Sequence, residues 1–178
     1  MEKSTSIHTI IRILLKELRL ERQVQQAQIG VLLGKSASVW SKVESGESEL
    51  SLDHLVTGCT ACQAWPSDLL QTAQNYMTLL QQYGWFVASH GSALPKSEDL
   101  LSIAADEYYS FVAKNRSPVP TFSRYQVLQT PWPWPQHYAP LDVFRWATDD
   151  VWKTTLLSPQ IPPPPPPAPL PSFPPGDF

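Results

Sequence analysis

The chain has 178 residues, of which 13 are Lys or Arg and 16 are Asp or Glu, so its formal net charge at pH 7 is −3. Apolar residues make up 42% of the chain, which suffices for one or two small domains. No apolar stretch approaches the roughly 18 to 20 residues of a membrane-spanning helix, and the N-terminus lacks the pattern of a signal peptide. We therefore expect a cytoplasmic protein without membrane contact.

Five short helices are predicted in the first 83 residues. Apolar residues recur there at spacings of three and four, which is typical of amphipathic helices. Gly34 and Gly46 are suited to end the second and third helices, and the hydroxyl groups of Ser36 and Ser51 are suited to cap the third and fourth. The predicted helices cover residues 7–22, 27–33, 36–45, a segment that opens at Ser51, and 67–83 after Pro66.

The composition changes after residue 84. Residues 85–89 are predicted as a short strand, and residues 97–114 as a helix with Ser97 as its cap. Residues 116–140 hold six prolines and the tryptophans Trp132 and Trp134, so we expect an extended strap without regular helix, stabilised by packing of the tryptophans. An aromatic ligand pocket formed by Trp132 and Trp134 is the alternative. A last helix is predicted over residues 142–157.

The strip between residues 18 and 70 contains a series of motifs in a fixed order. They are Leu18-Arg19, Gln26, Leu33-Gly34, Ser36, Val43-Glu44-Ser45-Gly46 and Ser51-Leu52. The order and spacing resemble those of the phage repressor and Cro-like helix-turn-helix family, often called XRE. The resemblance implies a mainly α fold with a five-helix lambda-repressor-like domain that binds double-stranded DNA.

The resemblance also implies roles for individual residues. The helix 36–45 would lie in the DNA major groove, where Ala37, Ser38 and Lys42 face the bases and Lys42 can donate to guanine O6 or N7. Gln26 would hold a phosphate at the start of the second helix. The full set of implied DNA contacts is Gln26, Lys35, Ser36, Ala37, Ser38, Ser41, Lys42 and Ser45. Arg19 and Glu44 match a pair that forms a structural salt bridge in this family.

Several features favour a second hypothesis. Residues 1–70 hold seven basic and eight acidic side chains, whereas DNA affinity comes largely from neutralised phosphates. Gln23 stands where the family usually has a turn glycine, and Gly30 lies within the second helix at a cost of about 1 kcal/mol relative to alanine. The alternative is an interaction module, adaptor or antitoxin-like, that keeps the fold but binds a protein partner through its C-terminal part.

Enzymatic activity is not expected, because the sequence has no phosphate-binding glycine loop, HExxH or GxSxG motif. We also expect no cofactor and no metal site. Cys59 and Cys62 have only His54 near them in sequence, so core packing is favoured over half a zinc motif, and a thiol switch is the alternative. Trp40 is predicted to pack in the core, with exposure to DNA or a partner as its alternative.

The last 20 residues contain 11 of the 19 prolines, including an uninterrupted run over residues 162–167. Such a run favours a polyproline II rod of about 3.1 Å per residue. We predict a disordered solubilising tail; the alternative is docking through Leu170, Phe173 and Phe178 in an aromatic groove.

The predicted organisation is therefore a helix-turn-helix domain over residues 1–83, an aromatic-rich α+β segment over 84–157 for dimerisation or sensing, and a polyproline tail over 158–178. The predicted function is a sequence-specific transcriptional regulator of bacterial or phage type, acting as a homodimer. We expect the aromatic residues Tyr108, Tyr109, Trp146 and Trp152 to lie on helix exteriors and to serve as buried anchors of an interface.

Overall fold

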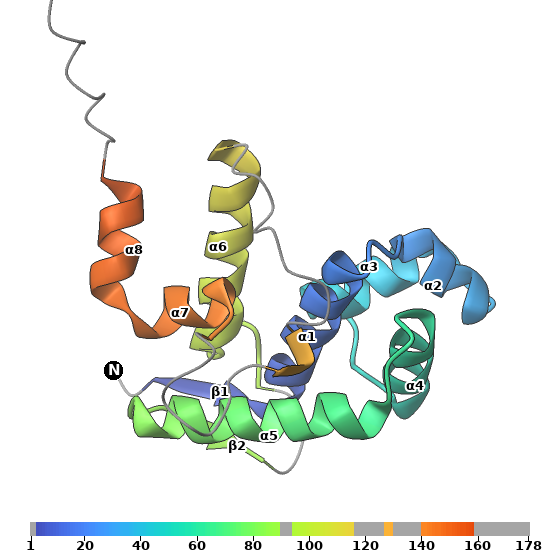
Figure 1. Cartoon of the computed structure of the whole chain (residues 1–178), viewed down its shortest axis with the longest axis horizontal. Coiled ribbons are helices and arrows are strands. Elements are labelled where there is room, and N and C mark those ends of the chain that lie inside the picture. Colours follow the sequence, from blue (N-terminus) through green and yellow to red (C-terminus); the bar gives the residue numbers. More distant parts are fainter. Residues whose placement is uncertain (1–2, 90–93, 116–126, 130–139, 159–178) are drawn as a thin grey trace, which may run out of the picture.

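The computed structural model describes residues 3–89, 94–115, 127–129 and 140–158. These residues form a mainly helical fold with a small two-stranded sheet (Figure 1). The elements are β1 (Ser4–Ser6), α1 (Ile7–Glu21), α2 (Gln26–Leu32), α3 (Ala37–Ser45), α4 (Leu52–Ala61), α5 (Pro66–Gln82), β2 (Phe86–Ala88), α6 (Leu100–Asn115), the single 3-10 turn η1 (Val127–Gln129), α7 (Asp142–Thr148) and α8 (Asp150–Leu157). Among the described helices, none is long and apolar enough to cross a membrane.

The ends of the N-terminal helices follow the sequence signals, with one exception. Gly34 and Gly46 have φ values of 64° and 76°, the left-handed conformation that glycine adopts most readily. Ser51 caps α4, since its hydroxyl accepts a hydrogen bond from the backbone N–H of His54. The predicted capping by the Ser36 hydroxyl is wrong: Ser36 makes no side-chain cap bond, and its Oγ lies 2.7 Å from Oγ of Ser38.

Strand β1 was not predicted from the sequence, because Ser4-Thr5-Ser6 lacks the apolar alternation of a typical strand. It pairs in parallel with β2, so that Ser4 lies opposite Phe86 and Ser6 opposite Ala88. The strand is held by polar contacts, since the buried Thr5 hydroxyl donates to the Asp99 carboxylate at 2.8 Å. The first residues of the fold are thereby joined to a segment that lies more than 80 residues further along the chain.

Asp99, and not the predicted Ser97, caps helix α6. Its carboxylate accepts hydrogen bonds from the backbone N–H of Ser102 at 3.0 Å and from the Thr9 hydroxyl at 2.6 Å. Asp99 is only 1% exposed, so these donors satisfy a carboxylate that has lost its water. Ser97 lies in the preceding turn, and sequence alone offers two plausible caps at this helix start.

The predicted single helix over residues 142–157 is divided in two at Asp149. This residue has a non-helical backbone with φ −119° and ψ 85°. Its side chain accepts from the backbone N–H of Trp152 at 2.9 Å and so caps α8. The apolar periodicity runs through the break, but an aspartate can compete with the helix for a backbone donor. Figure 1 shows the resulting sharp change of direction between α7 and α8.

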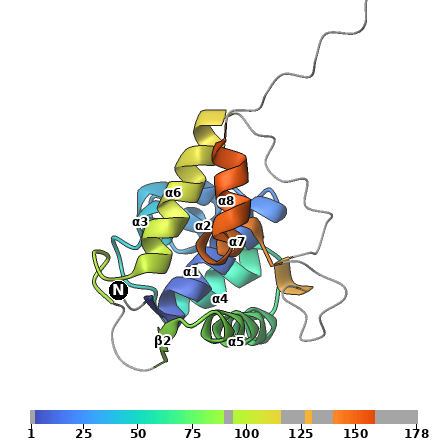
Figure 2. The same ribbon diagram turned by 90° about the vertical axis from the view of Figure 1, so that its left-hand side faces the viewer.

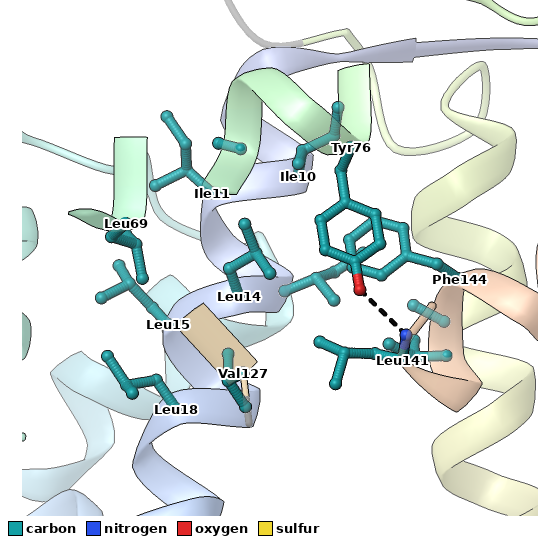
Figure 3. Packing of buried hydrophobic residues seen from close by; sticks show 14 of the residues in the cluster. Ile10, Ile11, Leu14, Leu15, Leu18, Leu69, Tyr76, Val127, Leu141 and Phe144 are labelled. Carbon is teal, nitrogen blue, oxygen red and sulfur yellow. Dashed lines mark hydrogen bonds between the residues drawn. The ribbon is translucent and has the colours of Figure 1, made fainter. Parts of the chain in front are cut away.

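One hydrophobic core is formed by residues from both the N-terminal and the C-terminal parts of the chain. Figure 3 shows α1 at its centre, with Leu14 and Leu18 near Val127 of η1. Tyr76 of α5 stacks on Phe144 of α7, with ring centroids 3.9 Å apart, and its hydroxyl accepts from the backbone N–H of Leu141 at 2.9 Å. Apolar side chains from before and after residue 84 are therefore buried together, and both groups stabilise the positions of α1 and α5.

The predicted strap lies mostly outside the described residues, as do Trp132, Trp134 and the tail from residue 159 onward. Its described part, η1, is a 3-10 turn and not an extended segment. Val127 at the start of η1 is fully buried, and its backbone N–H donates to the Glu21 carboxylate at 2.6 Å.

The placement of aromatic residues on helix exteriors is wrong for Tyr108 and Trp146, which are 5% and 1% exposed. Their ring centroids lie 5.8 Å apart, and the Trp146 ring is 6.3 Å from that of Trp152. Lys153 of α8 donates to Glu107 of α6 at 2.6 Å. Tyr108 and Trp146 are thus used in packing α6 against α7 and are not free for an interface. Figure 2 shows α6, α7 and α8 beside one another.

Candidate nucleic-acid interface

Helix α3 presents one polar face outward and one apolar face inward. Ser36 precedes the helix, and it is exposed together with Ala37, Ser38, Ser41 and Lys42. On the opposite side, Trp40 and Val43 are 0% and 1% exposed. Buried Trp40 and Val43 are three residues apart and exposed Ser38 and Lys42 are four apart, so each pair lies on one face, as expected for an amphipathic helix. The core-packing prediction for Trp40 is confirmed.

The carboxylate of Glu44 is the polar centre beneath this helix. It accepts hydrogen bonds from Nε and Nη2 of Arg19 at 2.5 and 2.9 Å, from Nε2 of Gln26 at 2.7 Å and from the indole Nε1 of Trp40 at 2.6 Å. The donors come from α1, α2 and α3, so one buried carboxylate joins all three helices. A satisfied network of this kind fixes the geometry of its surroundings.

Arg19 extends this network to the turn between α1 and α2. Its Nη1 donates to the backbone carbonyl of Val24 at 3.1 Å. The turn itself requires an unusual backbone, since Gln23 has a φ of 56°. A side chain with Cβ is strained in this region, which agrees with the glycine usual at this position in the resembled family.

Gly30 allows α2 and α3 to approach closely. A Cβ added at this position would lie 3.0 Å from the Lys35 carbonyl oxygen, from the Ser36 carbonyl carbon and from the Ala37 nitrogen. All three atoms belong to the backbone that leads into α3. This backbone cannot move aside for an added Cβ as the end of a flexible side chain could. Gly30 lowers the helix propensity of α2, but its lack of a side chain allows α2 and α3 to pack closely.

The side chains assigned to phosphate contacts differ in their exposure and in the hydrogen bonds that they already make within the protein. Lys35 is exposed in the turn between α2 and α3. Gln26 is half-buried, and its amide nitrogen already donates to Glu44. The hydroxyl of Ser45 donates within its own segment, to the Lys42 carbonyl at 3.2 Å and to the Glu47 carboxylate at 3.1 Å. Within the assigned set, Lys35 and Lys42 are thus the exposed cations.

An open groove of about 560 Å³ lies beside the start of α3. It is formed where the end of α1, the following turn and the first residues of α2 meet Ala37. Its lining residues are Arg19, Leu20, Gln23, Val24, Gln25, Gln26, Ala27 and Ala37. Of the buried Arg19–Glu44 pair, Arg19 lines this groove.

Lys96 is a neighbour of α3 that sequence reasoning missed. Its Nζ donates to the backbone carbonyl of Ser45 at 3.2 Å and forms an ion pair with Asp106 at 2.7 Å. A cation at the C-terminal end of a helix complements the helix dipole. Because Lys96 lies 51 residues beyond Ser45, no local sequence pattern could have indicated this contact.

Cys59 and Cys62 are free thiols, 0% and 1% exposed. Burial raises the pKa of Cys59 to about 11 and that of Cys62 to about 12, which keeps both thiols protonated. The core-packing prediction is confirmed, and burial argues against a thiol switch, which requires an accessible sulfur. Within the described ranges, no three His, Cys, Asp or Glu side chains gather as a metal site.

Comparison with known proteins identifies the N-terminal part of the chain. Residues 11–73 match a family model described as a helix-turn-helix domain, in the XRE-like group. The match covers most of α1, all of α2 to α4 and the first half of α5. No curated protein and no solved structure matches the chain. Residues 11–73 are therefore a helix-turn-helix domain, and DNA binding is the general function this domain suggests.

Proposed function

We propose that this protein is a sequence-specific transcriptional regulator of bacterial or phage type that reads the DNA major groove with the helix 36–45. The observation that carries the proposal is the exposed face of α3, with Ser38 and Lys42 directed away from the buried Trp40. Within the helix-turn-helix domain, this is the element that enters the groove in DNA-bound members of such folds.

Lys42 is the residue with the greatest capacity to read a base. Its ammonium group can donate to guanine O6 or N7 in the major groove. Ala37 and Ser38 are small, so they permit close approach and supply at most a methyl contact or one hydrogen bond. A large part of the sequence preference then comes from the shape and deformability of the DNA.

The Glu44 network supports this role by fixing α3 before DNA arrives. Arg19, Gln26 and Trp40 are all bound to the same carboxylate, so α3 cannot rotate without breaking several short hydrogen bonds. A preorganised reading helix loses little conformational entropy on binding. Lys35 and the second amide hydrogen of Gln26 are then available for phosphate oxygens on either side.

The proposed assembly is a homodimer on a pseudo-palindromic site. Half-sites one DNA turn apart place two recognition helices about 34 Å from each other. Such a regulator works in the cytoplasm without cofactor or catalysis, and the segment 84–157 supplies dimerisation or sensing.

The test is a selection from random DNA duplexes with the full chain, followed by binding measurements at several salt concentrations. We expect one enriched motif, with an affinity that falls steeply as salt rises. Lys42→Ala should weaken binding by about 1 to 3 kcal/mol and relax the preference at one base position. Lys114→Ala, at an exposed lysine near the end of α6, is the matched control and should leave the motif unchanged. A selection that enriches no sequence contradicts the proposal.

A second candidate is the interaction module, which the acidic surroundings of α3 favour. Glu47 and Glu49 are both exposed just beyond α3, where they would repel a phosphate backbone. This candidate predicts no motif in the duplex selection and a protein partner that copurifies at fixed stoichiometry through the C-terminal part.

A further inference from the structure

A second surface of the domain has the features of a binding site and plays no part in the proposed DNA contact. Trp65 lies between α4 and α5 with its side chain 74% exposed, an unusual state for so large an apolar group. Beside it is a pocket of about 530 Å³, lined by Val56, Thr60, Gln63, Ala64, Trp65 and Pro66. None of these lining residues carries a charge.

The chemistry of this pocket, here called the Trp65 pocket, suits a proline-rich ligand. Trp65 and Pro66 offer flat apolar surfaces on which proline rings can pack. Thr60 and Gln63 are exposed at the rim and can donate hydrogen bonds to backbone carbonyl oxygens. A proline-rich segment presents many carbonyl acceptors and few N–H donors, so a rim of side-chain donors matches it.

The chain itself contains such a segment after Ser158, where α8 ends. Residues 169–175 read Pro-Leu-Pro-Ser-Phe-Pro-Pro, with Leu170 and Phe173 as large apolar groups among the prolines. A polyproline segment has little conformational freedom left to lose, so docking costs it less entropy than it costs an ordinary peptide. Residues 169–175 carry no charge, like the pocket lining.

The distance from the end of α8 to the Trp65 pocket determines which part of the tail is long enough to dock there. Figure 1 shows α8 on the opposite side of the molecule from the junction of α4 and α5. A folded chain of this length has a diameter of about 40 Å, from a radius of gyration near 16 Å. In a polyproline II conformation of about 3.1 Å per residue, residues 169–175 would reach about 35 to 50 Å from Ser158, whereas the proline run 162–167 would end too soon. The run is thus suited to be a spacer.

We propose that residues 169–175 of the same chain dock in the Trp65 pocket, with the proline run 162–167 spanning the distance. The proposal does not depend on the DNA-binding function. It assigns a role to the exposed Trp65 side chain and to the apolar residues of the tail.

Paramagnetic broadening in the full chain tests the proposal. A nitroxide is attached to a Gly176→Cys variant labelled with ¹⁵N; the native thiols of Cys59 and Cys62 are buried and do not compete for the reagent. We expect the indole resonance of Trp65 and the amide resonance of Ala64 to lose most of their intensity and to recover it when the nitroxide is reduced. The indole resonance of the buried Trp85, which follows the far end of α5, serves as an internal reference that should keep its intensity.

Two further samples make the result decisive. Leu170→Ser combined with Phe173→Ser should restore the Ala64 signal without changing the thermal unfolding midpoint. An unlabelled ¹⁵N chain mixed with a spin-labelled ¹⁴N chain should show no broadening, because the contact is within one molecule. Broadening in the mixed sample assigns the pocket to a second copy and overturns the proposal. Full intensity of Trp65 and Ala64 in the labelled chain overturns it as well.

Discussion

Trp40 and Glu44 are joined across one turn of helix α3, because the indole Nε1 of Trp40 donates to Oε1 of Glu44 at 2.6 Å. The bond satisfies the only polar atom of a fully buried indole. It also completes a carboxylate that Arg19 of α1 already holds. The inward face of α3 is therefore held by specific polar contacts, whereas the outward face carries small side chains and Lys42 that are exposed.

Glu44→Gln tests how much this centre contributes to stability. The amide has one acceptor oxygen in place of two, and it leaves the Arg19 guanidinium without its counter-charge in a buried site. We expect a loss of about 3 to 5 kcal/mol in the free energy of unfolding, measured by urea denaturation. Glu47→Gln is the control, because Glu47 is exposed; its effect should stay within about 0.5 kcal/mol. Equal effects of the two substitutions contradict a structural role for Glu44.

Glu17 makes the stability of the fold depend on pH. Burial raises the pKa of Glu17 to about 7, although the Tyr109 hydroxyl donates to its carboxylate at 2.6 Å and Lys16 and Arg19 favour the charge. Asp142 of α7 adds to the rise. The folded chain therefore holds this proton at pH values where the unfolded chain has released it. The free energy of unfolding consequently falls as the pH rises from about 4.5 to about 7.

Glu17→Gln removes this dependence. Above about pH 7 the buried carboxylate is charged in the folded protein, at a cost of about 3 kcal/mol from about 1.4 kcal/mol per pKa unit. We expect the variant to exceed the natural chain in stability by up to that amount at pH 8 and to match it near pH 4. Chemical denaturation at both pH values measures the difference. A constant difference across the range would show that Glu17 does not titrate there.

Gly30→Ala separates helix propensity from packing. Propensity alone predicts that the substitution stabilises α2 by about 1 kcal/mol. The added Cβ, however, would press against backbone atoms of Lys35, Ser36 and Ala37, so we expect destabilisation by about 1 to 3 kcal/mol. The unfolding free energy gives the sign directly. Val31→Ala in the same helix is the control, because Val31 is 76% exposed and should be nearly neutral.

Gln23→Gly should stabilise the protein by about 1 kcal/mol. Gln23 has a φ of 56°, where a Cβ collides with the following carbonyl group and glycine does not. Gln25→Gly provides the comparison, since Gln25 has an ordinary φ of −81°, so glycine there adds freedom to the unfolded chain and removes the Gln25 side chain from the capping box of α2. Thermal unfolding should move to higher temperature for the first variant and to lower temperature for the second. The same direction for both contradicts strain at Gln23.

Much of the first domain could be predicted from local sequence. The apolar spacing in residues 7–22 and 67–83 gave the two long helices, and Gly34 and Gly46 marked helix ends that the structure places in the left-handed region. The candidate interface followed from the motifs around α3, and its exposed side chains lie on one face. Local signals sufficed because each depends on the residues within one or two helical turns.

The contacts that tie distant parts of the chain together could not be predicted in this way. Ser4–Ser6 becomes a strand because Phe86–Ala88 lies beside it, and Lys96 reaches α3 only because the fold brings its loop there. Glu44 was expected to pair with Arg19, but the additional donors from Gln26 and Trp40 depend on the packing of three helices. In the first domain, the sequence determined which segments are helical and which face of α3 points outward. Tertiary packing decided where the helix after residue 142 breaks and which further polar groups meet Glu44, since these outcomes depend on positions far apart in the chain.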